Sequence, residues 1–133
     1  MNIWIGGDVD SDIYENFRVA RNFFEKELTR IFKQQQWDDQ VLEIRLLFVV
    51  REGGSSFPSN PKFIKREKVI EFDSYLDYNE IRNSSLYKII EMIKTKLSAD
   101  ISIMSNNPKL PDYNYYAISE IINSLKFANY NES

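Results

Sequence analysis

The chain has 133 residues and contains neither cysteine nor histidine. These two absences exclude disulfides, thiolate metal ligands, cysteine nucleophiles and the general base that enzymes use most often near neutral pH. With 17 basic and 20 acidic side chains, the formal net charge is −3, which disfavours generic nucleic-acid binding because phosphate contacts need a basic surface. No apolar run approaches the roughly 20 residues of a membrane span, and the N-terminal segment lacks the pattern of a signal peptide. We therefore expect one cytoplasmic domain over residues 1–133 that binds neither nucleic acid nor membrane.

The first predicted elements are a short buried strand and a long amphipathic helix. The strand covers the apolar residues 3–5. Gly6 and Gly7 follow and indicate a simple turn, because glycine accepts backbone angles that other residues avoid. The acidic segment 8–12 is suited to the positive end of a helix. Apolar residues then recur at helical spacing and form one stripe that we expect to face the core. The stripe consists of Ile13, Phe17, Ala20, Phe24, Leu28 and Ile31.

Two further strands are predicted, with a loop between them. In residues 41–50 one set of alternate side chains is apolar and the other is mixed, so we expect one face of the sheet to be half covered or open. Residues 51–61 are rich in glycine, serine and proline, which predicts a loop too long for a tight hairpin. Residues 62–73 form the third predicted strand. The charged middle of that strand, 65–68, is typical of an exposed or edge strand.

The remainder of the chain predicts helices. Residues 77–80 have the spacing of a capping box, and a helix begins there or afresh at Ser84 or Ser85. That helix ends at 105–108, and a last helix begins at 111–112. The order is strand, helix, strand, strand, helix, helix. It predicts an α+β domain with a small three-stranded mixed sheet and helices packed mainly on one face.

The strand directions carry a prediction about charge. If the first two strands are parallel neighbours and the third runs antiparallel to the second, the start of the second and the end of the third share one edge of the sheet. Two acidic clusters meet there, with aromatic residues beside them. The aromatic residues could simply pack with their polar atoms in water, but tyrosine and tryptophan are also typical interface anchors. We expect this acidic edge to bind a partner protein through Trp37, Asp38, Asp39, Glu43, Glu71, Asp73, Tyr75, Asp77, Tyr78 and Glu80.

The aspartates before the first helix permit a second hypothesis. A calcium loop beginning at Asp8 fails, because its sixth and twelfth positions hold Ile13 and Val19 instead of glycine and glutamate. A magnesium site remains open, and the alternative function is a small carboxylate-based, metal-assisted hydrolase that uses Asp8, Asp10 and Asp12. The simpler interpretation is a solvated acidic helix start.

Two more possibilities concern serine chemistry and self-association. Serine hydrolysis is disfavoured, since the chain has no Gly-x-Ser-x-Gly motif and no histidine. A homodimer could form through the exposed sheet face around Leu47 and Val49. Such a dimer is a third hypothesis, and it does not exclude binding to another protein.

Several segments resemble a known family. Residues 3–8, Ile-Trp-Ile-Gly-Gly-Asp, and residues 17–22, Phe-Arg-Val-Ala-Arg-Asn, resemble the immunity proteins of bacterial polymorphic toxin systems, in particular immunity family 44. Residues 76–80 and 111–113 are also similar, and the likeness in element order spans most of the chain. The resemblance implies a small cytoplasmic α+β protein that binds a cognate toxin domain and blocks it, without catalysis and without a cofactor. Many such toxins cleave nucleic acid with basic clefts, which an acidic surface would attract and occupy.

Overall fold

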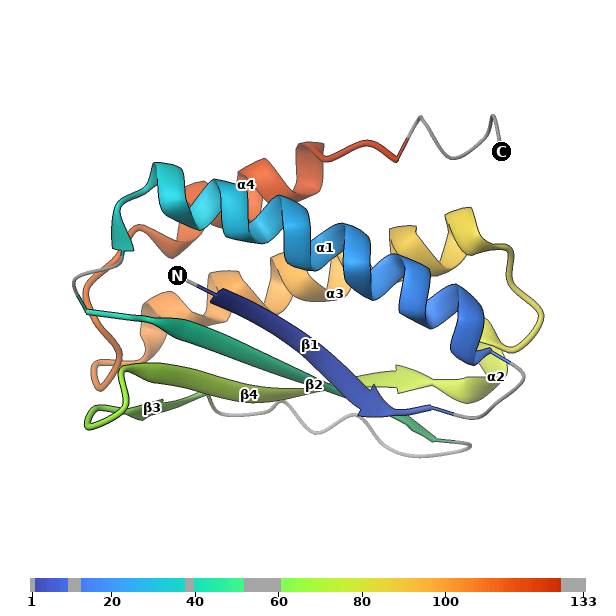
Figure 1. Cartoon of the computed structure of the whole chain (residues 1–133), viewed down its shortest axis with the longest axis horizontal. Coiled ribbons are helices and arrows are strands. Elements are labelled where there is room, and N and C mark those ends of the chain that lie inside the picture. Colours follow the sequence, from blue (N-terminus) through green and yellow to red (C-terminus); the bar gives the residue numbers. More distant parts are fainter. Residues whose placement is uncertain (1, 10–12, 38–39, 52–60, 128–133) are drawn as a thin grey trace.

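The computed structural model describes residues 2–9, 13–37, 40–51 and 61–127. Within these residues the chain forms a four-stranded sheet with helices over one of its faces (Figure 1). The strands are β1 (Asn2–Asp8), β2 (Glu43–Arg51), β3 (Lys62–Ile64) and β4 (Val69–Asp77). The helical elements are α1 (Tyr14–Gln34), α2 (Tyr78–Ile81), α3 (Leu86–Ile103), the 3-10 turn η2 (Met104–Asn106) and α4 (Tyr115–Ser124). The predicted α+β class, with helices on one side of a mixed sheet, is confirmed.

β1 is longer than the predicted strand and includes both glycines. Gly6 and Gly7 pair in register with Leu47 and Phe48 of the parallel strand β2. The prediction of a turn at the glycine pair is therefore wrong, because the backbone of both residues continues the ladder. On the outer side of β1 the amide of Ile5 donates a hydrogen bond of 2.8 Å to the carboxylate of Glu25 in α1. This bond ties the edge strand to the helix that covers it.

The third predicted strand is in fact two strands. Its charged middle, residues 65–68, is a turn between β3 and β4, and Lys68 there has a positive φ of 57°. The sheet order is β1-β2-β4-β3, with β3 antiparallel to β4 and β4 parallel to β2. The predicted antiparallel pairing of the second and third strands is wrong, because the reversal at the turn returns β4 to the direction of β2. The sheet therefore has four strands instead of three.

The core lies between the sheet and the helical layer. All six residues of the predicted helical stripe are buried, and they belong to one core cluster with Ile44, Leu46 and Phe48 of β2. Small polar residues let α3 and α4 pack closely: the hydroxyls of Ser98 and Ser119 are 2.8 Å apart, and the Ser119 hydroxyl also donates to the Ser98 carbonyl at 2.8 Å. The Ser98–Ser119 contacts thus add polar links to the packing of α3 on α4.

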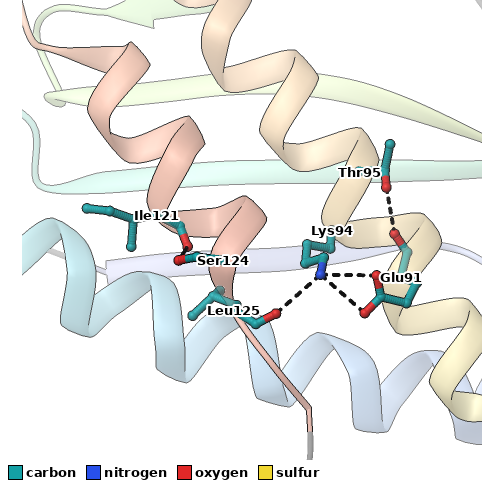
Figure 2. Close-up of polar contacts among 6 residues, drawn as sticks. All are labelled: Glu91, Lys94, Thr95, Ile121, Ser124 and Leu125. Atoms are coloured by element: carbon teal, nitrogen blue, oxygen red, sulfur yellow. Dashed lines mark hydrogen bonds and ion pairs between the residues drawn. The ribbon is translucent and has the colours of Figure 1, made fainter.

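A lysine of α3 holds the end of α4 (Figure 2). The Nζ atom of Lys94 donates to the carbonyl oxygen of Leu125, just after α4, at 3.2 Å. The same Nζ atom lies 3.0 Å from a carboxylate oxygen of Glu91. A cation at the C-terminal end of a helix is favourable, because the last carbonyl groups there carry partial negative charge. Lys94 thereby fixes α4 against α3.

Candidate interaction surface

One face of the sheet is covered by none of the described helices, and we call it the open face. Successive side chains of a strand point to opposite faces, so the residues that alternate with the buried ones point away from the helices. Residues Glu43, Arg45 and Leu47 of β2 are all partly exposed, which confirms the half-open face predicted for this strand. Among the described side chains, the open face contains Asn2, Trp4, Gly6, Glu43, Arg45, Leu47, Lys62, Ile64, Val69, Glu71, Asp73 and Asp77.

Arg45 lies at the centre of the charges on the open face. Its Nε atom donates to Oε2 of Glu43 at 2.8 Å, and its Nη1 atom lies 3.7 Å from Oε2 of Glu71. The strand register places Trp4 beside Arg45 on one side and Lys62 beside Glu71 on the other. A row of an aromatic ring, a cation, an anion and a second cation therefore crosses all four strands. The two carboxylates hold the guanidinium group in a defined position.

Trp4 is the large exposed aromatic residue of this row. Its side chain is 45% exposed, so the prediction that residues 3–5 are all buried holds for Ile3 and Ile5 only. A Cβ atom added to Gly6 would lie 2.4 Å from the tip of the Trp4 ring. The indole therefore lies directly on the main chain of Gly6, which explains why this glycine is buried although it faces away from the helices. Because Gly6 has no side chain, the indole can pack against its main chain.

Among the described residues, the predicted acidic edge is not one cluster. In the parallel register Glu43 pairs with Val69 at the start of β4, whereas Asp77 pairs with Arg51 at the far end of β2. The start of β2 and the end of β4 thus lie at opposite ends of the sheet, contrary to the prediction. Glu43, Glu71 and Asp73 instead share the open face, and Asp77 lies at its end. Glu80 lies in α2.

Trp37 differs most from its predicted environment. Its side chain is only 3% exposed, and its ring contacts those of Phe32, Tyr113 and Tyr115. The role of an anchor needs an exposed surface that Trp37 does not have in this fold. Of the other predicted partner-binding residues, Asp38 and Asp39 lie outside the described residues. Tyr75 in β4 and Tyr78 at the start of α2 have described backbones only, so their predicted contacts stay predictions.

Sequence reasoning missed Trp4 and Arg45 as candidate interface residues. Trp4 alternates with two buried isoleucines and precedes Gly6 by two positions, which is the spacing of residues on one face of a strand. That spacing was the available signal. The sequence does not indicate Arg45 as an interface residue, because the ion pair that orders its side chain is with Glu71 of another strand.

One carboxylate, that of Asp100, is partly buried between α3 and the sheet. Asp100 of α3 accepts a hydrogen bond of 2.6 Å from the hydroxyl of Ser74 in β4 and lies 3.4 Å from Nζ of Lys96. Burial raises the pKa of Asp100 above its ordinary value, and the contacts with Ser74 and Lys96 oppose that rise. Both carboxylate oxygens contact protein groups, and the Ser74–Asp100 hydrogen bond connects α3 to the sheet.

The metal-assisted hydrolase hypothesis is not tested by these side chains. Among the described residues no group of three acidic side chains is arranged to hold a metal ion. Asp10 and Asp12 lie outside those residues, and only the backbone of Asp8 is described. Within the same described residues, no helix has the length and apolar character needed to cross a membrane.

These features define a small α+β fold whose described helices cover one face of a four-stranded sheet. The family model of immunity protein 44 matches residues 1–126, and the chain belongs to this family. No curated protein and no solved structure matches the chain significantly. Membership in the family implies a non-catalytic inhibitor that binds a toxin protein.

Proposed function

We propose that this protein neutralises one cognate toxin domain by binding it through the open face, and that the toxin is a nuclease with a basic cleft. The family match over residues 1–126 carries the proposal. Inhibition by binding requires a rigid domain with a complementary surface, and it requires none of the chemistry that histidine, cysteine or a cofactor supplies.

The charge of the open face supports a basic target. Its described side chains include four carboxylates, those of Glu43, Glu71, Asp73 and Asp77, and two cations, those of Arg45 and Lys62. A net negative face attracts a cleft that is built to bind phosphates, and it can occupy the path of the substrate there.

Co-expression tests the proposal. The C-terminal domain encoded by the open reading frame immediately upstream should arrest growth when it is expressed alone. Co-expression of this protein should restore growth, and the two chains should purify as a stoichiometric complex. The double variant Glu71→Lys, Asp73→Lys should weaken protection, whereas Glu120→Lys on the exposed side of α4 should protect as well as the wild type does. A toxic neighbour that is neither bound nor neutralised would contradict the proposal for that pair.

A further inference from the structure

Trp4 has an exposed ring whose orientation is set before any partner arrives. Its tip passes over Gly6 at a distance that leaves no room for a Cβ atom there. The ring is held flat against the strand and still exposes 45% of its side chain. An aromatic residue that is already ordered loses little conformational freedom on binding, and that loss is one of the main costs of association. Trp4 therefore has the properties of an interface anchor.

Arg45 is ordered in the same way by its neighbours. The hydrogen bond to Glu43 at 2.8 Å and the ion pair to Glu71 at 3.7 Å hold its guanidinium group, and the strand register pairs Arg45 with Trp4. The side chain of Arg45 is 38% exposed, so the partner can still reach it. Tryptophan and arginine are among the residue types enriched in the few positions that carry most of the binding energy of an interface.

The charges around this pair indicate the partner's chemistry. Carboxylates outnumber cations among the described side chains of the open face, and Arg45 is already shared between two of them. A second copy of this chain would bring together two faces whose described carboxylates outnumber their described cations, which electrostatics disfavours. A basic protein surface with an apolar side chain at its centre complements both the carboxylates and the indole.

We infer that Trp4 and Arg45 form the central anchor of the interface with the toxin, and that the toxin covers the indole with an apolar side chain and surrounds it with basic residues. This inference rests on the proposed function. It adds which residues contribute most to the binding energy. These residues lie on β1 and β2 and differ from the aromatic anchors predicted from the sequence. Gly6 contributes to this anchor, because only glycine at that position leaves room for the indole against the strand.

The test measures the affinity and dissociation rate of purified variants with a catalytically inactive toxin domain. Trp4→Ala should weaken binding about 30-fold or more, the size of effect that defines an interface hot spot. Gly6→Ala retains the indole but displaces it from the main chain of residue 6. This variant should weaken binding by several-fold, mainly through faster dissociation. In the Trp4→Ala background, Gly6→Ala should have no further effect. Tyr116→Ala removes an aromatic ring that is 65% exposed on α4, and it should leave the affinity unchanged.

The outcomes separate the inference from the proposed function. Each variant is first shown to keep the wild-type melting temperature within a few degrees, so that loss of folding does not imitate loss of binding. If the wild-type complex forms but Trp4→Ala and Gly6→Ala bind as the wild type does, the inference is overturned and the proposed function stands. If no complex forms with the wild type, both are overturned. Light scattering that shows a dimer dissolved by Trp4→Ala would assign the open face to a second copy and would also overturn the inference.

Discussion

The indole of Trp37 stacks on the ring of Tyr113, with ring centroids 4.2 Å apart and planes 9° from parallel. The Tyr113 hydroxyl also donates a 2.7 Å hydrogen bond to the carbonyl oxygen of Trp37. The segment after α1 is thereby fixed to the segment before α4. Trp37→Ala should lower the free energy of unfolding by about 3–5 kcal/mol, as expected for removal of a large buried aromatic side chain. Urea denaturation measures this loss.

The exposed tryptophan is the control for this prediction. Trp4→Ala should change the free energy of unfolding far less than Trp37→Ala, because Trp4 is half exposed and lies outside the core. The two variants should therefore show opposite patterns, with stability lost at Trp37 and toxin binding lost at Trp4. A Trp37→Ala protein of unchanged stability that fails to bind the toxin would restore the anchor role first expected of Trp37.

The sequence predicts features that depend on local patterns, but it does not predict the different environments of these two tryptophans. The helical stripe of α1 was predictable because its period is local and leads to burial wherever the helix lies. The environment of Trp37 depends on Tyr113, which is 76 positions away, and no local pattern contains that information. The direction of β4 depends on the turn at residues 65–68. Lys68 adopts there a left-handed conformation that normally marks glycine or asparagine. Because residues 65–68 contain neither glycine nor asparagine, the sequence predicts a charged strand there instead of a turn. The acidic edge that follows from this prediction is therefore wrong.

Asp100 should make stability depend on pH. Its pKa is raised in the folded state, chiefly by burial. The folded protein therefore binds the proton of Asp100 more tightly than the unfolded chain does. The resulting stabilisation is fully present below the ordinary pKa of 3.8 and is lost as pH rises through the higher pKa of the folded state. Asp100→Asn removes the ionisation and retains an acceptor for the Ser74 hydroxyl. The variant should gain stability relative to the wild type as pH rises from 4 to 7, measured by denaturation at both pH values.

A second substitution at this site distinguishes the charge from its hydrogen bond. Ser74→Ala removes the hydroxyl that donates to Asp100 at 2.6 Å. It should cost about 1–3 kcal/mol near neutral pH, because the partly buried carboxylate loses a hydrogen-bond partner. If Asp100→Asn were less stable than the wild type at pH 7 by a larger margin than at pH 4, the ionised carboxylate would be stabilising, contrary to this account.

The two neighbouring glycines of β1 should respond differently to alanine. A Cβ atom at Gly7 would lie 2.1 Å from the main-chain carbonyl oxygen of Phe48, which cannot move unless β1 separates from β2. Gly7→Ala should therefore destabilise the protein by about 1–3 kcal/mol, the usual cost of overpacking. At Gly6 the nearest atoms belong to the tip of the Trp4 side chain, which can swing away, so Gly6→Ala should stay within about 0.5 kcal/mol of the wild type. Thermal melts of both variants check the order, and equal losses would contradict it.

Lys94 should stabilise the helical layer through the end of α4 (Figure 2). Lys94→Met keeps most of the aliphatic length but removes the ammonium group that meets the Leu125 carbonyl and the Glu91 carboxylate. The expected cost is about 1 kcal/mol, since one hydrogen bond and a favourable charge at a helix end are lost together. Lys88→Met on the exposed side of α3 is the matched control and should be neutral. A Lys94→Met protein as stable as this control would mean that the contact contributes nothing.

Association and dissociation of the toxin complex should depend on different residues of the open face. Charges at the rim of an interface act mainly on the association rate, and that contribution is screened by salt. The wild-type association rate should therefore fall on the order of tenfold between low and high ionic strength. Asp73→Asn should lower the rate at low salt and flatten its salt dependence, while the dissociation rate changes little. Trp4→Ala should do the reverse, because the indole acts only after contact is made. Stopped-flow mixing at several salt concentrations measures both rates, and an association rate that is independent of salt would rule out steering by the carboxylates of this face.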